Sequence, residues 1–139
     1  MKKFSLVMLL TVAALNSALA DSKSDTFTVT AANFTGGNTS YSLSNVEDKG
    51  FFNMPNNPMK NGNAGQFKMD WKKHYRGAYV TFSMPDNTQC QAQMEVTEWC
   101  GWKGHCQEYR YNKVLNNTPG NSPYTCQVVG SDKFVMVRR

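Results

Sequence analysis

A chain of 139 residues with 15 Lys and Arg, 10 Asp and Glu and a formal net charge of +5 suits one domain of ordinary size. No run of five like charges occurs, which excludes a polybasic tail, and the mild positive excess favours acidic surfaces without demanding any one of them. Asn, Ser, Thr and Gly are abundant and long helical periodicity is absent, so the composition favours an all-β domain.

The first 20 residues have the three parts of a secretory signal peptide. Lys2 and Lys3 form a basic n-region, residues 4–15 an apolar h-region, and residues 18–20 (Ala-Leu-Ala) a cleavage site. The apolar run is about a dozen residues, short of the ~20 that a membrane-spanning helix needs, so cleavage is favoured over an anchor. We expect a single mature domain of residues 21–139, secreted to the periplasm or out of the cell. The short Lys-Lys signal is typical of bacteria.

The first half of this domain contains four segments in which apolar and polar side chains alternate with the two-residue period of β-strands. They are residues 26–31, 40–44, 66–71 and 78–84. Residues 50–65 form a long connection without such alternation. Connections of this length are usually functional or packed down by their own side chains, and we expect Phe51 and Phe52 to pack onto the domain.

The second half contains a predicted β-hairpin and two further strands. The hairpin strands are residues 91–99 and 107–115, and the last two strands are residues 124–128 and 133–137. About eight short strands at roughly ten-residue spacing are typical of a sandwich or small barrel. We therefore predict an all-β fold, a single antiparallel β-sandwich.

Four cysteines in an exported domain predict two disulfides, for which three connectivities exist. Cys100 and Cys106 lie nearly opposite one another if the hairpin forms, which favours a bond between them and a second bond between Cys90 and Cys126. An even set of cysteines leaves no spare thiol for catalysis. Zinc bound by Cys100, His105 and Cys106 is the competing interpretation. It is disfavoured because no C-x-x-C occurs and export favours disulfides, so we predict neither a metal nor a cofactor.

The tip of the hairpin is the strongest candidate binding site. Amphipathic aromatic side chains suit a bilayer interface, a sugar ring or a protein interface. Trp102 lies in a glycine-flanked loop where burial is difficult, which favours a contact residue, whereas Trp99 and the tyrosines suit the sandwich core as well as a site. The candidate ligand-binding residues of the hairpin are Trp99, Trp102, Lys103, His105, Tyr109 and Arg110.

A second candidate is the basic and aromatic loop of residues 71–76, in which Lys72, Lys73 and Arg76 could contact phosphate of lipid headgroups or RNA. The alternative for this loop is a solvated connection. An enzyme would have to use His74 and His105 as general acid and base, for example in phosphodiester cleavage. No familiar catalytic motif occurs in the chain, so we predict no catalytic residues.

The first half of the mature chain resembles small secreted membrane-active β-sandwich proteins of the aegerolysin and actinoporin type. The residues that carry the resemblance are 32–35 (Ala-Asn-Phe-Thr), 41–45, 50–55, 65–67 and 76–82. The resemblance implies a compact sandwich that binds lipid headgroups or related surface ligands without catalysis. The disulfide-bonded half from Cys90 onward has no counterpart in it, so no binding residues are transferred.

These observations predict an exported, non-enzymatic binding module that recognises a membrane, glycan or host surface through the hairpin tip. Two alternatives from other classes stay open. One is a protein–protein module, such as an inhibitor of another exported protein, and the other is a small secreted nuclease that uses His74 and His105. The sequence carries no strong nucleic-acid signal and does not determine the oligomeric state.

Overall fold

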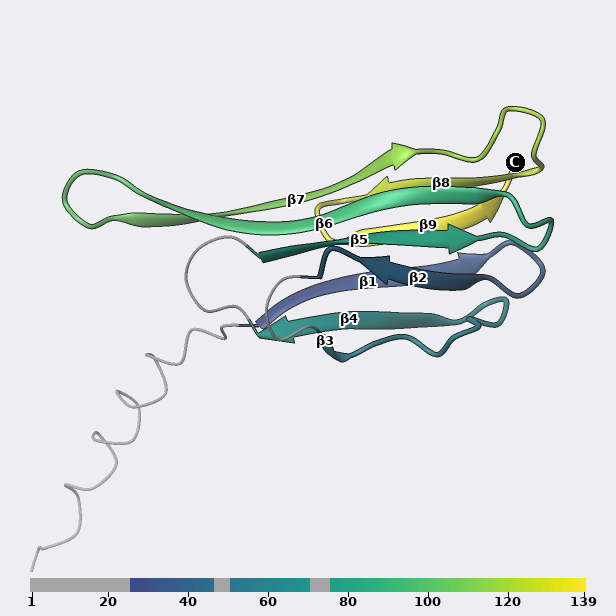
Figure 1. The fold of residues 1–139 in the computed structure, drawn as a ribbon, viewed down its shortest axis with the longest axis horizontal. Coiled ribbons are helices and arrows are strands. Elements are labelled where there is room, and N and C mark those ends of the chain that lie inside the picture. Colours follow the sequence, from purple (N-terminus) through teal and green to yellow (C-terminus); the bar gives the residue numbers. More distant parts are fainter. Residues whose placement is uncertain (1–25, 47–50, 71–75) are drawn as a thin grey trace, which may run out of the picture.

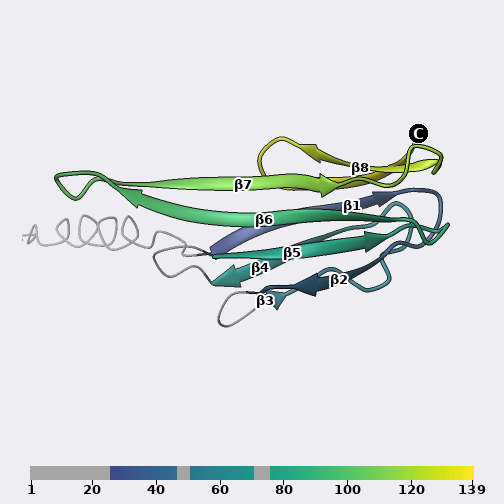
Figure 2. The ribbon, with the colours of Figure 1, turned by 45° about the horizontal axis from the view of Figure 1, so that its top comes forward.

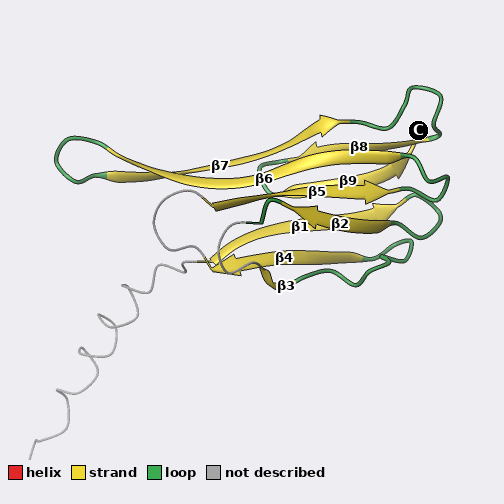
Figure 3. Ribbon diagram, in the orientation of Figure 1, coloured by secondary structure: helices red, strands yellow, loops and turns green. Residues whose placement is uncertain are grey.

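The computed structural model describes residues 26–46, 51–70 and 76–139, and within these ranges it contains nine β-strands and no helix (Figures 1 and 3). The strands form a five-stranded sheet of order β3-β4-β1-β9-β8 and a four-stranded sheet of order β2-β5-β6-β7. Their bounds are β1 Thr26–Phe34, β2 Ser40–Ser44, β3 Phe51–Asn53, β4 Ala64–Asp70, β5 Arg76–Ser83, β6 Gln89–Cys100, β7 Cys106–Asn116, β8 Tyr124–Val129 and β9 Lys133–Arg138. The predicted all-β sandwich with two disulfides is confirmed, with one strand more than the sequence indicated.

The core lies between the two sheets because each strand turns its apolar side chains to one face. In β1 the buried residues Phe27, Val29 and Ala31 alternate with half-exposed threonines. The rings of Phe82 in β5 and Phe134 in β9 meet across the sheets with centroids 6.1 Å apart, and both side chains are fully buried. Contacts of this kind join the two sheets into one domain.

One strand pair departs from the predicted antiparallel arrangement. β1 lies between β4, with which it pairs antiparallel, and β9, with which it pairs parallel from Thr30 opposite Lys133 to Phe34 opposite Val137. The parallel pair places the last strand of the chain in the middle of a sheet beside the first. None of the described segments is a helix long and apolar enough to cross a bilayer.

The long connection predicted for residues 50–65 contains the additional strand β3. Phe51 packs its ring against that of Phe67, with centroids 5.6 Å apart, as expected for a packed aromatic residue. The same expectation for Phe52 is wrong, because this side chain is 60% exposed. Successive side chains of a strand point to opposite faces, so only one of two neighbouring phenylalanines can face the core.

The rest of that connection is held by a buried asparagine at the end of β1. Asn33 is fully buried, and its Nδ2 donates hydrogen bonds of 2.8 Å to the carbonyl oxygens of Gly37 and Met59. Its Oδ1 accepts hydrogen bonds from the backbone N–H and the hydroxyl of Thr35. A buried amide with these partners fixes two loops against each other, since any unpaired group there would be costly.

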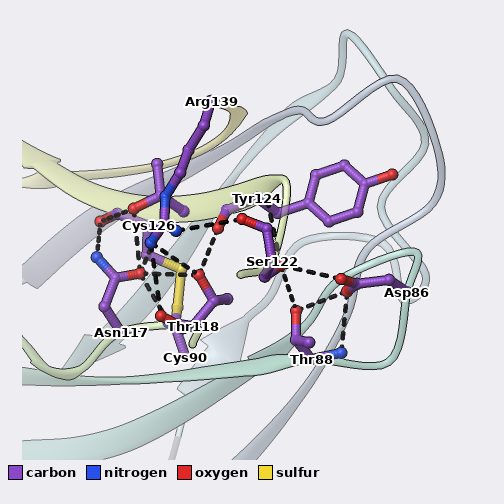
Figure 4. The surroundings of a disulfide bond; sticks show 10 residues. Asp86, Thr88, Cys90, Asn117, Thr118, Ser122, Tyr124, Cys126 and Arg139 are labelled. Carbon is purple, nitrogen blue, oxygen red and sulfur yellow. Dashed lines mark hydrogen bonds between the residues drawn. A yellow bond between two sulfur atoms is a disulfide. The ribbon is translucent and has the colours of Figure 1, made fainter. Parts of the chain in front are cut away.

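The Cys90–Cys126 disulfide links β6 to β8 and thereby one sheet to the other (Figure 4). Hydrogen bonds around it hold the chain between β7 and β8. The Asn117 side chain accepts from the Cys126 N–H and donates to the Cys126 carbonyl oxygen. The Arg139 guanidinium donates to the carbonyl oxygens of Pro119, Gly120 and Ser122. Both predicted disulfides are present, which is consistent with an oxidising location.

Asp86 joins this region to the turn between β5 and β6. Its carboxylate accepts hydrogen bonds from the Thr88 hydroxyl at 2.6 Å, the Thr88 N–H at 3.0 Å and the Ser122 hydroxyl at 2.9 Å. Desolvation raises the pKa of Asp86, but the hydrogen bonds from Thr88 and Ser122 together lower it by more, so this pKa lies below its ordinary value of 3.8.

The lowered pKa predicts how the free energy of unfolding depends on pH. A carboxylate whose pKa is lower in the folded state stabilises the protein above its unfolded pKa, and this contribution is lost as pH falls through the folded pKa. Asp86→Asn is therefore expected to be less stable than the native protein at neutral pH. The difference between the two should close as pH falls below 3.8. Urea titrations of both proteins across this range would test the prediction, and a pH-independent difference would contradict it.

Candidate functional site: the β6–β7 arm

The hairpin of β6 and β7 extends beyond the sandwich as a projecting arm (Figures 1 and 2). Among the described residues, β5 pairs with β6 as far as Arg76 opposite Val96, whereas β6 and β7 remain paired as far as Cys100 and Cys106. Residues 97–109 are therefore a two-stranded ribbon without a third strand among the described residues. We call these residues the arm, and residues 101–105 its tip.

The tip is a short loop closed by a disulfide. Cys100 and Cys106 bond across the ribbon with Cα atoms 3.9 Å apart, as the hairpin pattern predicted. Within the loop the Gly101 N–H donates to the His105 carbonyl oxygen at 2.9 Å, and the Gly104 N–H donates to the Gly101 carbonyl oxygen at 3.2 Å. These cross-links hold the loop in one shape before any ligand arrives.

Trp102 is 99% exposed at the centre of this loop, so the predicted exposure is confirmed. Lys103 and His105 are exposed beside it. Lys103 has a φ of 112°, a region that side-chain-bearing residues rarely adopt, and Gly104 follows with a φ of 73°. The turn therefore presents one large apolar ring, a lysine and a histidine to solvent at the end of the arm.

Trp99 lies at the foot of the tip and is 67% exposed. A Cβ added to Gly101 would lie 3.5 Å from Cζ3 of Trp99, so the indole ring lies beside the Gly101 backbone. Of the two roles that the sequence allowed for Trp99, the structure places it on the arm and not in the sandwich core. The two tryptophans thus belong to one end of the molecule.

The two tyrosines of β7 continue this aromatic surface from the arm onto the four-stranded sheet. Tyr109 lies opposite Thr97 and Tyr111 opposite Glu95, and these residues face away from the core because their neighbours Met94 and Val96 are buried. The tyrosine rings are nearly parallel, with centroids 6.4 Å apart. The alternative in which they cover the core is therefore wrong.

Arg110 lies on the opposite face of the ribbon, toward the other sheet. Its guanidinium is 5.8 Å from the centroid of the buried Phe27 ring and forms an ion pair with Glu108 on the same strand. A cation over an aromatic face and a neighbouring carboxylate fix this side chain at the base of the arm. Arg110, predicted as a ligand contact, thus lies on the face of the ribbon opposite to Trp99 and the two tyrosines.

The second candidate site is only partly visible. Lys72, Lys73 and His74 lie outside the described residues, and Arg76 is the first residue of β5 and not part of a loop. The nuclease alternative, which pairs His74 with His105, therefore stays a prediction. Arg76 lies opposite Val96, which places the end of the basic segment at the base of the arm.

The chemistry available to the arm is that of contact and not of coordination. The Glu98 carboxylate and the sulfur atoms of Cys100 and Cys106 lie within 4.8 Å of one another, but the two sulfurs are bonded and offer no thiolate. A small cavity of about 30 Å³ involves Pro55, Met59 and Asn63 and no residue of the arm. It has room for a water molecule and not for a ligand of ordinary size.

Comparison of the chain with protein-family models finds no match, and comparisons with curated proteins and with solved structures also find none.

Proposed function

We propose that this protein is an exported, non-enzymatic binding module that attaches to the interface of a lipid bilayer through the tip of the arm. The observation that carries the proposal is the nearly complete exposure of Trp102 on a projecting loop closed by a disulfide. Leaving an indole ring in water is unfavourable, and tryptophan is enriched where an apolar phase meets water.

The shape of the tip favours a bilayer over a small ligand or a glycan. Small-molecule sites are concave and bury most of their ligand, whereas Trp102 is almost fully exposed at the end of a projecting hairpin. A soft interface can close around such a ring from all sides. Lys103 beside it would meet anionic headgroups, an attraction of about 1 kcal/mol for a lysine near a charged surface.

The disulfide has a defined part in this proposal. A loop that is already in its bound shape loses little conformational entropy on binding, so more of the contact energy appears as affinity. The proposal also agrees with the surface binding implied by the resemblance of the first half of the chain to membrane-active sandwich proteins. Attachment through the tip would also allow the rings of Tyr109 and Tyr111 to lie along the headgroups.

Trp102→Ala is expected to lower the partition coefficient onto phosphatidylcholine vesicles containing phosphatidylglycerol by about tenfold or more. Tryptophan carries roughly 150–250 Å² of surface, and burying a third of it at about 25 cal/mol per Å² corresponds to ~1.4 kcal/mol, or a factor of ten. Co-sedimentation of the oxidised mature protein with vesicles gives the partition coefficient directly.

Two variants control this measurement. Phe52→Ala removes another exposed aromatic ring, which lies in β3 and outside the arm, and should leave vesicle binding unchanged. Lys103→Ala should weaken binding only to vesicles that contain the anionic lipid. If native protein ignores vesicles but binds a glycan array or recovers one protein partner, the bilayer is the wrong surface. Equal loss in Trp102→Ala and Phe52→Ala would exclude the tip as the anchor.

A further inference from the structure

The outer edge of β7 is a long strand edge whose backbone N–H and C=O groups have no partner strand among the described residues. β7 is the last strand of its sheet, and no described strand pairs with it on the side away from β6. Exposed edges present rows of free N–H and C=O groups that accept a further strand, and proteins usually shorten or block them. This edge is 11 residues long and carries no proline.

The alternation of the hairpin shows which residues of β7 direct their backbone groups outward. Cys100 and Cys106 lie opposite each other with Cα atoms 3.9 Å apart, the close spacing of a non-hydrogen-bonded pair, and the bond from the Gly101 N–H to the His105 carbonyl oxygen just beyond them fits this alternation. The β6–β7 register is regular from Ala92 to Cys100, and hydrogen-bonded and non-hydrogen-bonded pairs alternate along it. The backbone N–H and C=O of Tyr109 therefore bond to β6. The backbone N–H and C=O groups of Glu108 and Arg110 point instead to the free edge.

Two copies of this edge can pair antiparallel with each other in only a few registers, because the outward-pointing N–H and C=O groups of one copy must meet those of the other. The two-fold axis must pass through a residue, so that outward-pointing residues meet outward-pointing residues. An axis at Glu108 or at Arg110 places like charges opposite each other. An axis at Tyr109 places Glu108 opposite the Arg110 of a second copy, and Arg110 opposite its Glu108. Opposite charges at facing positions stabilise a strand pair, and like charges destabilise it.

We propose that two copies of this protein associate through the outer edges of β7, paired antiparallel about Tyr109 over residues 106–112. The partner is thus a second copy of the same chain. Charge complementarity selects it, because the sequence Glu-Tyr-Arg at the free edge is its own complement in this register. The two tyrosines at the axis form a non-hydrogen-bonded pair, in which side chains lie closest.

This association does not depend on what the tip binds, but it affects the tip. In the proposed register each tip extends along the partner's strand past Asn112, beside the partner's sandwich. Pairing and attachment to a surface are then competing uses of the arm. This last consequence rests on the proposed function, and it predicts that a monomeric variant binds vesicles at least as well as native protein does.

Sedimentation velocity of the mature, oxidised protein tests the pairing without any ligand. Native protein should shift toward twice the monomer mass as its concentration rises. Arg110→Glu places glutamates at both 108 and 110, and Glu108→Arg places arginines at both, so each variant alone should remain monomeric. Because each keeps one sign of charge, an equimolar mixture of the two variants should form a heterodimer. The double variant Glu108→Arg/Arg110→Glu should dimerise again.

Each outcome decides the proposal. Native protein that stays monomeric at the highest soluble concentration would overturn it, as would native-like dimers of both single variants. Monomeric variants whose mixture also stays monomeric would overturn the register. Circular dichroism and thermal melting of each variant show whether it is folded, and recovery in the mixture separates lost pairing from lost folding. If the native protein is monomeric but binds vesicles, the pairing is wrong and the proposed function stands. If it dimerises but does not bind vesicles, the proposed function is wrong and the pairing stands.

Discussion

Replacing Cys90 and Cys126 together by alanine is expected to lower the free energy of unfolding by about 4 kcal/mol. The bond joins positions 36 residues apart and links the two sheets, so it removes many conformations from the unfolded chain. Both sulfur atoms belong to buried residues, and their loss also leaves unfilled space in the core. Urea unfolding under oxidising conditions measures the change.

The second disulfide serves as the internal control for this prediction. Cys100 and Cys106 are only six positions apart and exposed, so replacing both by alanine should cost at most about 2 kcal/mol. If the disulfides stabilise mainly by lowering the entropy of the unfolded chain, the loss should be larger for the Cys90–Cys126 bond than for the Cys100–Cys106 bond. Equal losses in the two double variants, or a larger loss from the tip bond, would contradict it.

Phe67→Ala is expected to lower the free energy of unfolding by about 3–5 kcal/mol, the usual cost of truncating a buried phenylalanine. Phe67 is fully buried in β4, and its ring meets Tyr41 edge-on with centroids 5.1 Å apart. Phe51 contacts the same ring from β3. The substitution removes transfer energy and two aromatic contacts that join strands of both sheets.

Phe52→Ala is the matched control for the core prediction, because it removes the same side chain from an exposed position of β3. Its effect on the free energy of unfolding should stay within about 0.5 kcal/mol. Denaturant titrations of both variants measured under one condition give the comparison. A loss below about 1 kcal/mol for Phe67→Ala would show that this cluster does not stabilise the sandwich.

Local patterns predicted most of the fold. Alternation as regular as that of Phe27, Val29 and Ala31 fixes both the strand and its buried face, because the side-chain period of a strand is two. The pairing of Cys100 with Cys106 followed from the hairpin that they flank. The exposure of Trp102 followed from the glycines around it.

Long-range features were not predictable in the same way. Strand β3 is three residues long, too short for a periodic pattern, and the parallel pairing of β1 with β9 joins the two ends of the domain. The projection of the arm depends on how far β6 and β7 extend beyond the rest of the sandwich, which no local residue of the arm encodes. For the same reason the sequence could not decide whether Trp99 faces the core or solvent.

The most direct test of the central claim is the fluorescence of Trp102 alone. In the variant Trp71→Phe/Trp99→Phe the tip carries the only tryptophan of the chain. On addition of vesicles containing phosphatidylglycerol, we expect its emission to shift to shorter wavelength and to be quenched by lipids brominated near the headgroup. If the variant binds the vesicles while its emission stays that of an indole in water, the tip is not the part of the protein that enters the bilayer interface.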